Sequence, residues 1–406
     1  MPVLRRCLTP RRLRYAWFVG GALWMAWLIS IVGGQGLLDL AGTPIGTDYL
    51  QFYAAGTTVR TGNGAELYDI PYQMALEEEI IGPGLSTYHA FITPPFLAWL
   101  YAPLSVLTYS WSFILWSILG LVCMWLSLHL IGVTNTPMAF LWSLTFFPVF
   151  AAISFGQNSL LTLLIFSATY RLWRSRRGFW AGLVLSLALY KPQLAVGVAF
   201  LWLLDVRTSW GALLGLALGG LALVAVSFGL TPEAGLAYLA FARSTLPDLP
   251  TWEEFPIWHL HTVRGFWRLL LPWWPRVGDF FTIVLSGGAV WAFVWYWRRN
   301  RSRLLLLYAA GVVLGLCVTP HAMIYDWSLL LVPAFLAAEA CPDLSERWRV
   351  ARALVWMVVL VSGPLTFAQL RFLPTAVQLS VPVLLWAVFH ISQDLAVAEC
   401  DGSEPE

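Results

Sequence analysis

The sequence predicts an all-α polytopic membrane protein, and three features of its composition support this. Hydrophobic residues make up 59% of the 406 residues and charged residues only 11%, whereas a soluble domain carries roughly 25% charged residues. The mean hydropathy is +0.71. The chain also has 24 tryptophans, a residue enriched at membrane interfaces. So few charged residues cannot cover the water-facing surface of a soluble protein of 406 residues.

The first predicted span is residues 15–32, an apolar segment that follows the basic stretch 5–14. At about 1.5 Å per residue it is long enough to cross a bilayer. A signal peptide would carry a shorter apolar core and a small-residue cleavage site. We therefore interpret it as a transmembrane helix whose basic start stays in the cytoplasm.

Clusters of arginine mark the cytoplasmic ends of the later spans, because cytoplasmic loops carry an excess of basic residues. Beside 5–14 these are 171–177, 298–303 and 347–352, with Arg207 as a weaker marker. The predicted spans are about 15–32, 109–131, 137–152, 157–173, 178–190, 192–204, 210–228, 277–297, 304–319, 323–340, 350–365 and 375–391. This gives about twelve transmembrane helices with both termini inside. Residues 94–107 are either a further span or a re-entrant piece.

We expect one integral membrane domain over residues 1–392, followed by an acidic, disordered cytoplasmic tail at 393–406. Two long polar segments, about 33–93 and 229–276, fall on the outer face. The first contains a stretch with helical spacing after Asp48, which is expected to lie flat in the interface. The acidic run at 77–79 is interpreted as a solvated loop face.

Several polar residues of the apolar chain fall at the same outer membrane boundary in this topology. Ionisable side chains at membrane depth are costly and usually face a cavity, so the sequence predicts a polar pocket there. Its candidate residues are Asp48, Gln157, Asn158, Lys191, His259, His261, Arg264, His321 and Asp326.

Asp48 has two interpretations. Aspartate before "YLQFYAAG" suits a helix N-cap. A carboxylate beside a cleft can also act as a general base that takes a proton from an acceptor hydroxyl. Composition does not decide between the two.

Lys191 is the single lysine of the chain and precedes Pro192, which breaks a helix. Broken helices at membrane depth usually line cavities, and a buried ammonium needs an anion. A lipid phosphate is one partner; snorkelling of the side chain to the interface is the alternative. Arg264 is a second candidate for a phosphate ligand.

His321 follows Pro320 at a predicted span boundary. It is suited to hold a phosphate or a hydroxyl, or to carry a proton, although a capped helix start explains the "TPH" motif equally well. The histidine and cysteine spacings do not match a metal site. A nucleotide-binding fingerprint and a basic surface for nucleic acid are also missing from the sequence.

Five segments in order resemble glycosyltransferase family 87, a family of the multi-span GT-C architecture that is similar to polyprenyl-phosphate-mannose-dependent α-mannosyltransferases. They are "GTDYLQFYAAGTTVRTGNGAELYD" (46–69), "FITPPFLAWLYAPLS" (91–105), "GQNSLLTLLIFSA" (156–168), "AGLVLSLALYKPQLAV" (181–196) and "TPHAMIYDWSLLLVP" (319–333). Tyr49 stands where phenylalanine is more usual.

The resemblance implies transfer of a sugar, most often mannose, from a polyprenyl-phosphate donor to a glycolipid or glycan hydroxyl. It implies Asp48 as base and His321 in the active site, on the extracytoplasmic side of the inner (plasma) membrane and without a cofactor. The expected donor-phosphate ligands are Lys191 and Arg264. The expected substrate contacts are Tyr49, Gln157, Asn158, His261 and Asp326. A transporter or flippase of a lipid-linked saccharide is the alternative, but the two halves show no internal repeat.

Overall fold

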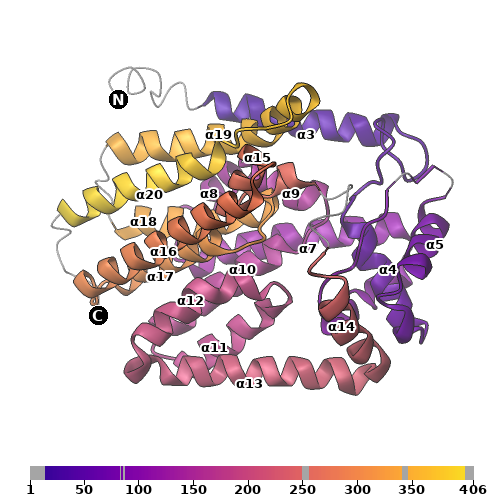
Figure 1. Cartoon of the computed structure of the whole chain (residues 1–406), viewed down its shortest axis with the longest axis horizontal. Coiled ribbons are helices and arrows are strands. Elements are labelled where there is room, and N and C mark those ends of the chain that lie inside the picture. The colour runs from indigo at the N-terminus through magenta and orange to yellow at the C-terminus, as the bar shows by residue number, and fades with distance from the viewer. Residues whose placement is uncertain (1–13, 83, 86, 249–255, 341–345, 398–406) are drawn as a thin grey trace.

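The computed structural model describes residues 14–82, 84–85, 87–248, 256–340 and 346–397. This part of the chain is helical, and its only β-structure is isolated bridges. In Figure 1, α3 and α19 lie along one edge of the molecule and α13 along the opposite edge, with α10 and α12 between them. The all-α membrane class predicted from composition is therefore observed.

Several predicted spans match observed helices within a few residues, whereas the helix at the predicted span 350–365 runs over 346–372, and the polar segments contain further helices. The described chain forms the following helices. They are α3 (Tyr15–Gly33), α4 (Tyr49–Arg60), η1 (Gly64–Glu66), α5 (Ile70–Ile81), α6 (Pro95–Tyr101), η2 (Leu104–Val106), α7 (Tyr109–Leu130), α8 (Thr136–Leu144), α9 (Phe147–Ser154), α10 (Ser159–Arg174), α11 (Gly178–Ser186), η3 (Leu187–Tyr190), α12 (Pro192–Leu204), α13 (Val206–Leu230), α14 (Pro232–Ser244), η5 (Ile257–His259), α15 (Val263–Leu270), α16 (Pro275–Arg299), α17 (Leu304–Val318), η6 (Ile324–Leu330), α18 (Leu331–Ala340), α19 (Glu346–Phe372) and α20 (Ser380–Val397).

Five helices of the described chain are long and apolar enough to cross a bilayer: α3, α7, α13, α16 and α19. The pair α8 and α9, bent by 72°, adds a sixth if it is one broken span. The predicted count of about twelve is not confirmed, because α11, α12, α17 and α18 are shorter apolar helices.

The ends of the predicted domain also differ in detail from the expectation. Helix α20 continues to Val397, past the predicted start of the tail at residue 393. The acidic residues 398–406 and most of the first basic cluster lie outside the described residues.

The uncertain segment 94–107 forms the seven-residue helix α6 and the turn η2. At about 1.5 Å per residue α6 is roughly 10 Å long, too short to be a span. It packs against α4, where the Phe52 and Tyr101 rings stack at a centroid distance of 4.8 Å. Aromatic neighbours on several sides bury most of α4 within the protein, and its position relative to the membrane interface stays a prediction.

The two long polar segments meet at one end of the molecule, where Figure 1 places α4, α5 and α14. The Tyr68 ring lies 5.4 Å from the Tyr238 ring and 5.2 Å from the Phe241 ring. The Trp99 indole donates a hydrogen bond of 2.8 Å to the Thr231 hydroxyl. Segments that are far apart in sequence thus form one polar end of the protein.

Small residues bring the helices that position the site into close contact. A Cβ atom on Gly197 of α12 would overlap the carbonyl oxygen of Gly311 on α17, and one on Gly182 of α11 would overlap that of Ala212 on α13. Such backbone contact is typical of helices that associate in lipid, where small residues allow close packing. Helix α12 begins after Lys191 and α17 ends before Thr319, so this contact fixes the distance between two parts of the site.

We expect Gly197→Val to separate α12 from α17 and to lower the thermal unfolding midpoint in detergent by several degrees, since overpacking costs about 1–3 kcal/mol. The matched control is Gly287→Val on α16, where a new Cβ meets no atom within 4 Å. Equal midpoints for the two variants would contradict this account of the packing.

Candidate functional site

Asp48 lies at the N-cap position of α4, yet its side chain makes no capping hydrogen bond. Its backbone is in the right-handed helical region (φ −75°, ψ −15°), whereas an N-cap normally has an extended backbone. The Oδ2 atom instead accepts a hydrogen bond of 2.7 Å from Gln157 Nε2. Asp48 is half-buried, with 23% of its side chain exposed. The capping interpretation does not describe the observed geometry.

Two glycines bring the loop of Asp48 against the turn before α10. Gly46 and Gly156 have positive φ angles of +70° and +69°, which side chains with a Cβ rarely adopt. A Cβ on Gly46 would overlap the Phe113 ring, and one on Gly156 would overlap Tyr49. The Tyr49 amide can therefore donate to the Phe155 carbonyl at 2.9 Å, which sets Asp48 beside Gln157.

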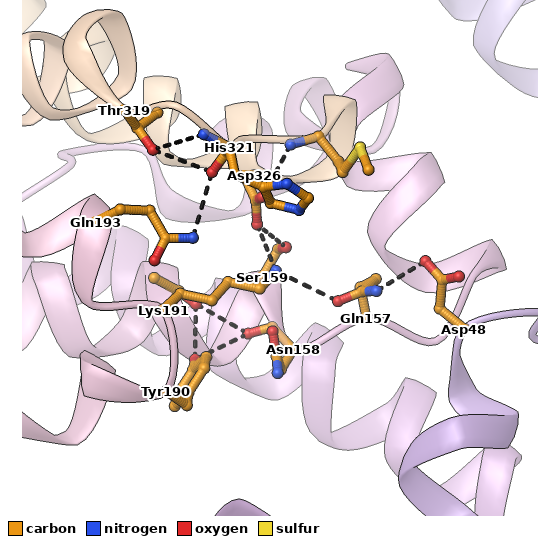
Figure 2. Close-up of polar contacts among 12 residues, drawn as sticks. Asp48, Gln157, Asn158, Ser159, Tyr190, Lys191, Gln193, Thr319, His321 and Asp326 are labelled. Atoms are coloured by element: carbon orange, nitrogen blue, oxygen red, sulfur yellow. Dashed lines mark hydrogen bonds and ion pairs between the residues drawn. The ribbon is translucent and has the colours of Figure 1, made fainter. Parts of the chain in front are cut away.

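A chain of polar contacts continues from Gln157 into the protein (Figure 2). Lys191 Nζ donates to Gln157 Oε1 at 3.4 Å and to Asp326 Oδ1 at 2.7 Å. Asp326 also accepts hydrogen bonds from the Ser159 hydroxyl at 3.0 Å and from the Met323 amide at 3.1 Å. The exposed fraction is 12% for the Lys191 side chain and 1% for that of Asp326.

The anion that Lys191 was expected to need is therefore present within the chain. A buried ion pair is tolerated when both charges are paired and hydrogen-bonded, and here each partner is. Asp326, an expected substrate contact, is directed at Lys191 and the start of η6. A donor phosphate that bound Lys191 would therefore share the ammonium with the Asp326 carboxylate.

His321 lies between α17 and η6, and its backbone is fixed on both sides. Its amide donates to the Thr319 hydroxyl at 3.2 Å, and its carbonyl accepts from Thr319 at 3.0 Å and from Gln193 at 3.3 Å. Burial lowers the pKa of His321 to about 4, and the nearby Asp326 carboxylate only partly opposes this. The ring is thus neutral at neutral pH and suited to hydrogen bonding, not to charge pairing.

Arg264 is half-buried near the start of α15 and interacts electrostatically with His321. Within the residues that the structure describes, we find no carboxylate paired with its guanidinium. Arg264 is therefore a cation next to the polar chain whose charge is not neutralised by the described part of the protein.

Three expected substrate contacts are fully buried. Tyr49 shares a hydrogen bond with the Ser112 hydroxyl, and His261 Nδ1 lies 2.6 Å from the Ser380 hydroxyl. Burial lowers the pKa of His261 to about 3. The amide nitrogen and oxygen of Asn158 are buried without a hydrogen-bond partner in the described chain. Contact of these three with a substrate remains a prediction.

Sequence reasoning did not identify His89 or Glu77. The Nδ1 atom of His89 lies 3.8 Å from Asp48 Oδ1. Glu77, expected on a solvated face, is instead fully buried, and its Oε2 accepts a hydrogen bond of 3.0 Å from the His89 amide. The prediction was wrong because α5 directs this side chain inward with Gln73, one turn earlier, while Glu78 and Glu79 are exposed. This i, i+4 pair is the signal that could have revealed it.

The surroundings of Asp48 favour its ionised form. Burial alone would raise the pKa of Asp48, but the His89 ring and the Gln157 amide outweigh it and hold the pKa below its ordinary value. His259, which interacts electrostatically with Asp48, has its pKa lowered to about 4 by burial. Asp48 is therefore ionised at neutral pH and ready to accept a proton.

An apolar cavity of about 210 Å³ lies beside His259. Phe155, Trp258 and Ile324 line its inner part, and Phe367 of α19, which is 42% exposed, lies at its outer side. A larger depression of about 390 Å³ on α3 is lined by apolar side chains and glycine only, far from this chemistry. In the described ranges, no three histidine, cysteine or acidic side chains lie close enough together to hold a metal ion.

The described chain is helical, has five helices that are long and apolar enough to cross a membrane, and belongs by a family comparison to the class of membrane glycosyltransferases. A sequence model of glycosyltransferase family 87 matches residues 91–320, more than half of the chain, and the protein belongs to this family. The match includes Gln157, Lys191 and Arg264. His321 lies one residue past its end, and Asp48 lies well before its start at residue 91. No curated protein and no solved structure matches the chain.

We expect Lys191→Met to lower the thermal unfolding midpoint strongly, because it leaves the buried Asp326 carboxylate unpaired at a cost of about 3–5 kcal/mol. Asp326→Asn should also lower the midpoint, because it leaves the buried Lys191 ammonium without its carboxylate partner. The double variant should lose much less stability than the two single losses added together. Additive losses in detergent would show that the pair is not coupled as described.

Proposed function

We propose that this glycosyltransferase moves a sugar, with mannose as the first candidate, from a polyprenyl-phosphate donor to a glycolipid or glycan hydroxyl. Asp48 is the general base. The observation that carries the proposal is the Asp48 carboxylate, which does not cap its helix, stays partly exposed and is held ionised by His89 and Gln157. A carboxylate that capped the helix would accept hydrogen bonds from the first backbone amides of α4, which Asp48 does not do.

In the proposed reaction, the acceptor hydroxyl gives its proton to Asp48 Oδ1, because Oδ2 is engaged by Gln157. The acceptor oxygen forms a bond to the anomeric carbon while the bond from that carbon to the phosphate oxygen breaks. The departing polyprenyl phosphate keeps the electron pair of the broken bond, and the configuration at the anomeric carbon is inverted. General-base catalysis of this kind contributes about 10²–10⁴-fold to the rate.

The cations near the polar chain are assigned to the phosphate. Arg264 offers a guanidinium that can bind phosphate oxygens in a bidentate manner. Lys191 contributes a second positive charge, shared with Asp326. The neutral His321 ring is proposed to hydrogen-bond the phosphate or a sugar hydroxyl.

The apolar cavity next to His259 is the proposed entry for the prenyl chain. Its lining is almost entirely aromatic and aliphatic, and α19 brings Pro364 and Phe367 to its exposed side. A lipid tail that enters there would lie beside His259, and its phosphate end would extend to the cations Lys191 and Arg264 of the site.

The arginine clusters support an extracytoplasmic position for this site in the inner (plasma) membrane, since basic residues favour the cytoplasmic side. A polyprenyl-phosphate sugar presented at the outer leaflet would reach Asp48 without crossing the bilayer. The aromatic side chains of the polar segments are suited to pack on the apolar faces of sugar rings.

The test is transfer by the purified protein from radiolabelled polyprenyl-phosphate sugars, supplied one at a time with a candidate lipid acceptor. Asp48→Asn should insert and fold normally, because asparagine is similar in size, yet lower the transfer rate by about 10²-fold or more. Asp39→Asn is the matched control, since Asp39 lies in the same loop and accepts hydrogen bonds from the amides of Ala41 and Thr43 and from the Ser30 hydroxyl, none of which belongs to the polar chain of the site. A rate for Asp48→Asn within a few-fold of wild type would contradict the proposal.

A further inference from the structure

His89 faces the oxygen of Asp48 that remains available for chemistry. The two carboxylate oxygens differ: Gln157 Nε2 donates to Oδ2 at 2.7 Å, whereas His89 Nδ1 lies 3.8 Å from Oδ1. A separation of 3.8 Å is too long for a hydrogen bond. Once Oδ1 carries a proton, it can donate a hydrogen bond to His89 Nδ1, and this attraction would bring the two atoms closer together.

The position of His89 is set by a dedicated contact from α5. Glu77 is fully buried and accepts the His89 amide at 3.0 Å. Burial raises the pKa of Glu77 to about 7, so this carboxylate is kept inside the protein at an energetic cost. A buried acid whose hydrogen bond, among the described residues, comes from a loop amide indicates that the position of this loop residue matters.

We propose that His89 is the proton acceptor of Asp48: after the acceptor hydroxyl has protonated Asp48 Oδ1, the proton moves to His89 Nδ1 and restores the carboxylate. This inference rests on the proposed function. The O–H bond of Asp48 breaks, an N–H bond forms, and the resulting imidazolium releases the proton to water. His89 Nε2 is buried, so the proton leaves for water from Nδ1, on the side of the partly exposed Asp48 carboxylate.

Chemistry favours this direction of transfer. In the relay His89 is neutral before the transfer, and the Gln157 amide, which donates to Oδ2, opposes the effect of burial on the pKa of Asp48. The ordinary pKa is about 4 for a carboxyl group and about 6.5 for an imidazole, so the proton favours the imidazole. Imidazole is the side chain that takes up and releases protons near neutral pH. His89 acts through Asp48 and is a positioning and relay residue, since it does not contact the sugar in this scheme.

The groups that surround this pair come from several elements. Asp48 precedes α4, Glu77 belongs to α5, and His259 belongs to η5. Tyr325 of η6 also interacts with the Asp48 carboxylate. Tyr109 of α7 interacts electrostatically with both Asp48 and Glu77. Of these, His259 is the other imidazole near Asp48, but burial lowers its pKa to about 4, which makes it the weaker proton acceptor.

The experiment compares His89→Ala and His89→Asn with the wild type and Asp48→Asn in the transfer assay. His89→Ala should lower kcat about tenfold or more while the KM for the donor stays within about twofold. Free imidazole added to the buffer should restore part of this rate, but none in Asp48→Asn. His89→Asn should be as slow as His89→Ala, because an amide of similar size does not take up a proton.

A near-normal kcat for His89→Ala or His89→Asn would overturn the relay, and so would a slow His89→Ala that imidazole does not restore. If His89→Ala does not fold, the rate of His89→Asn decides alone. These results are distinct from failure of the proposed function, in which the wild type transfers no polyprenyl-linked sugar or Asp48→Asn remains active.

Discussion

The ion pair between Lys191 and Asp326 is the interaction on which the site depends. A chain with only 11% charged residues places its single ammonium at a helix break with 12% of the side chain exposed. A charge in such surroundings must be paired. Because the two partners belong to the start of α12 and to η6, their contact at 2.7 Å ties two separate helical layers together.

Gln157 transmits this constraint to Asp48. Its amide group accepts from Lys191 with its oxygen and donates to Asp48 with its nitrogen. The orientation of the amide is therefore determined from both ends. The carboxylate that would perform the chemistry is placed by a network whose far end is an ion pair inside the protein, and not by its own helix.

Close backbone packing allows these contacts to form. The positive φ angles of Gly46 and Gly156 let the Asp48 loop approach the start of α10, and Gly197 lets α12 lie directly on α17. With side chains at these positions the same polar residues would be present but separated. The site therefore depends on glycines that carry no chemistry themselves.

Hydropathy and charge predicted the membrane class and the long helices α3, α7, α13, α16 and α19. They also singled out Asp48, Gln157, Lys191 and Asp326, which the structure joins in one chain of polar contacts. These are local properties, readable within one segment. The pairing of Lys191 with Asp326, 135 positions apart, and the burial of Glu77 depend on tertiary packing, which a single sequence does not encode locally. The same reason explains why His89 was missed and why the aromatic neighbours that enclose α4 were not foreseen.

The most direct test of this account is the pH dependence of sugar transfer by Gln157→Leu. Gln157 lowers the pKa of Asp48 while burial raises it, so loss of the amide should raise that pKa. The account predicts a lower kcat and an acid limb that moves to higher pH than in the wild type. An unchanged rate with an unchanged acid limb would show that the polar chain does not control Asp48.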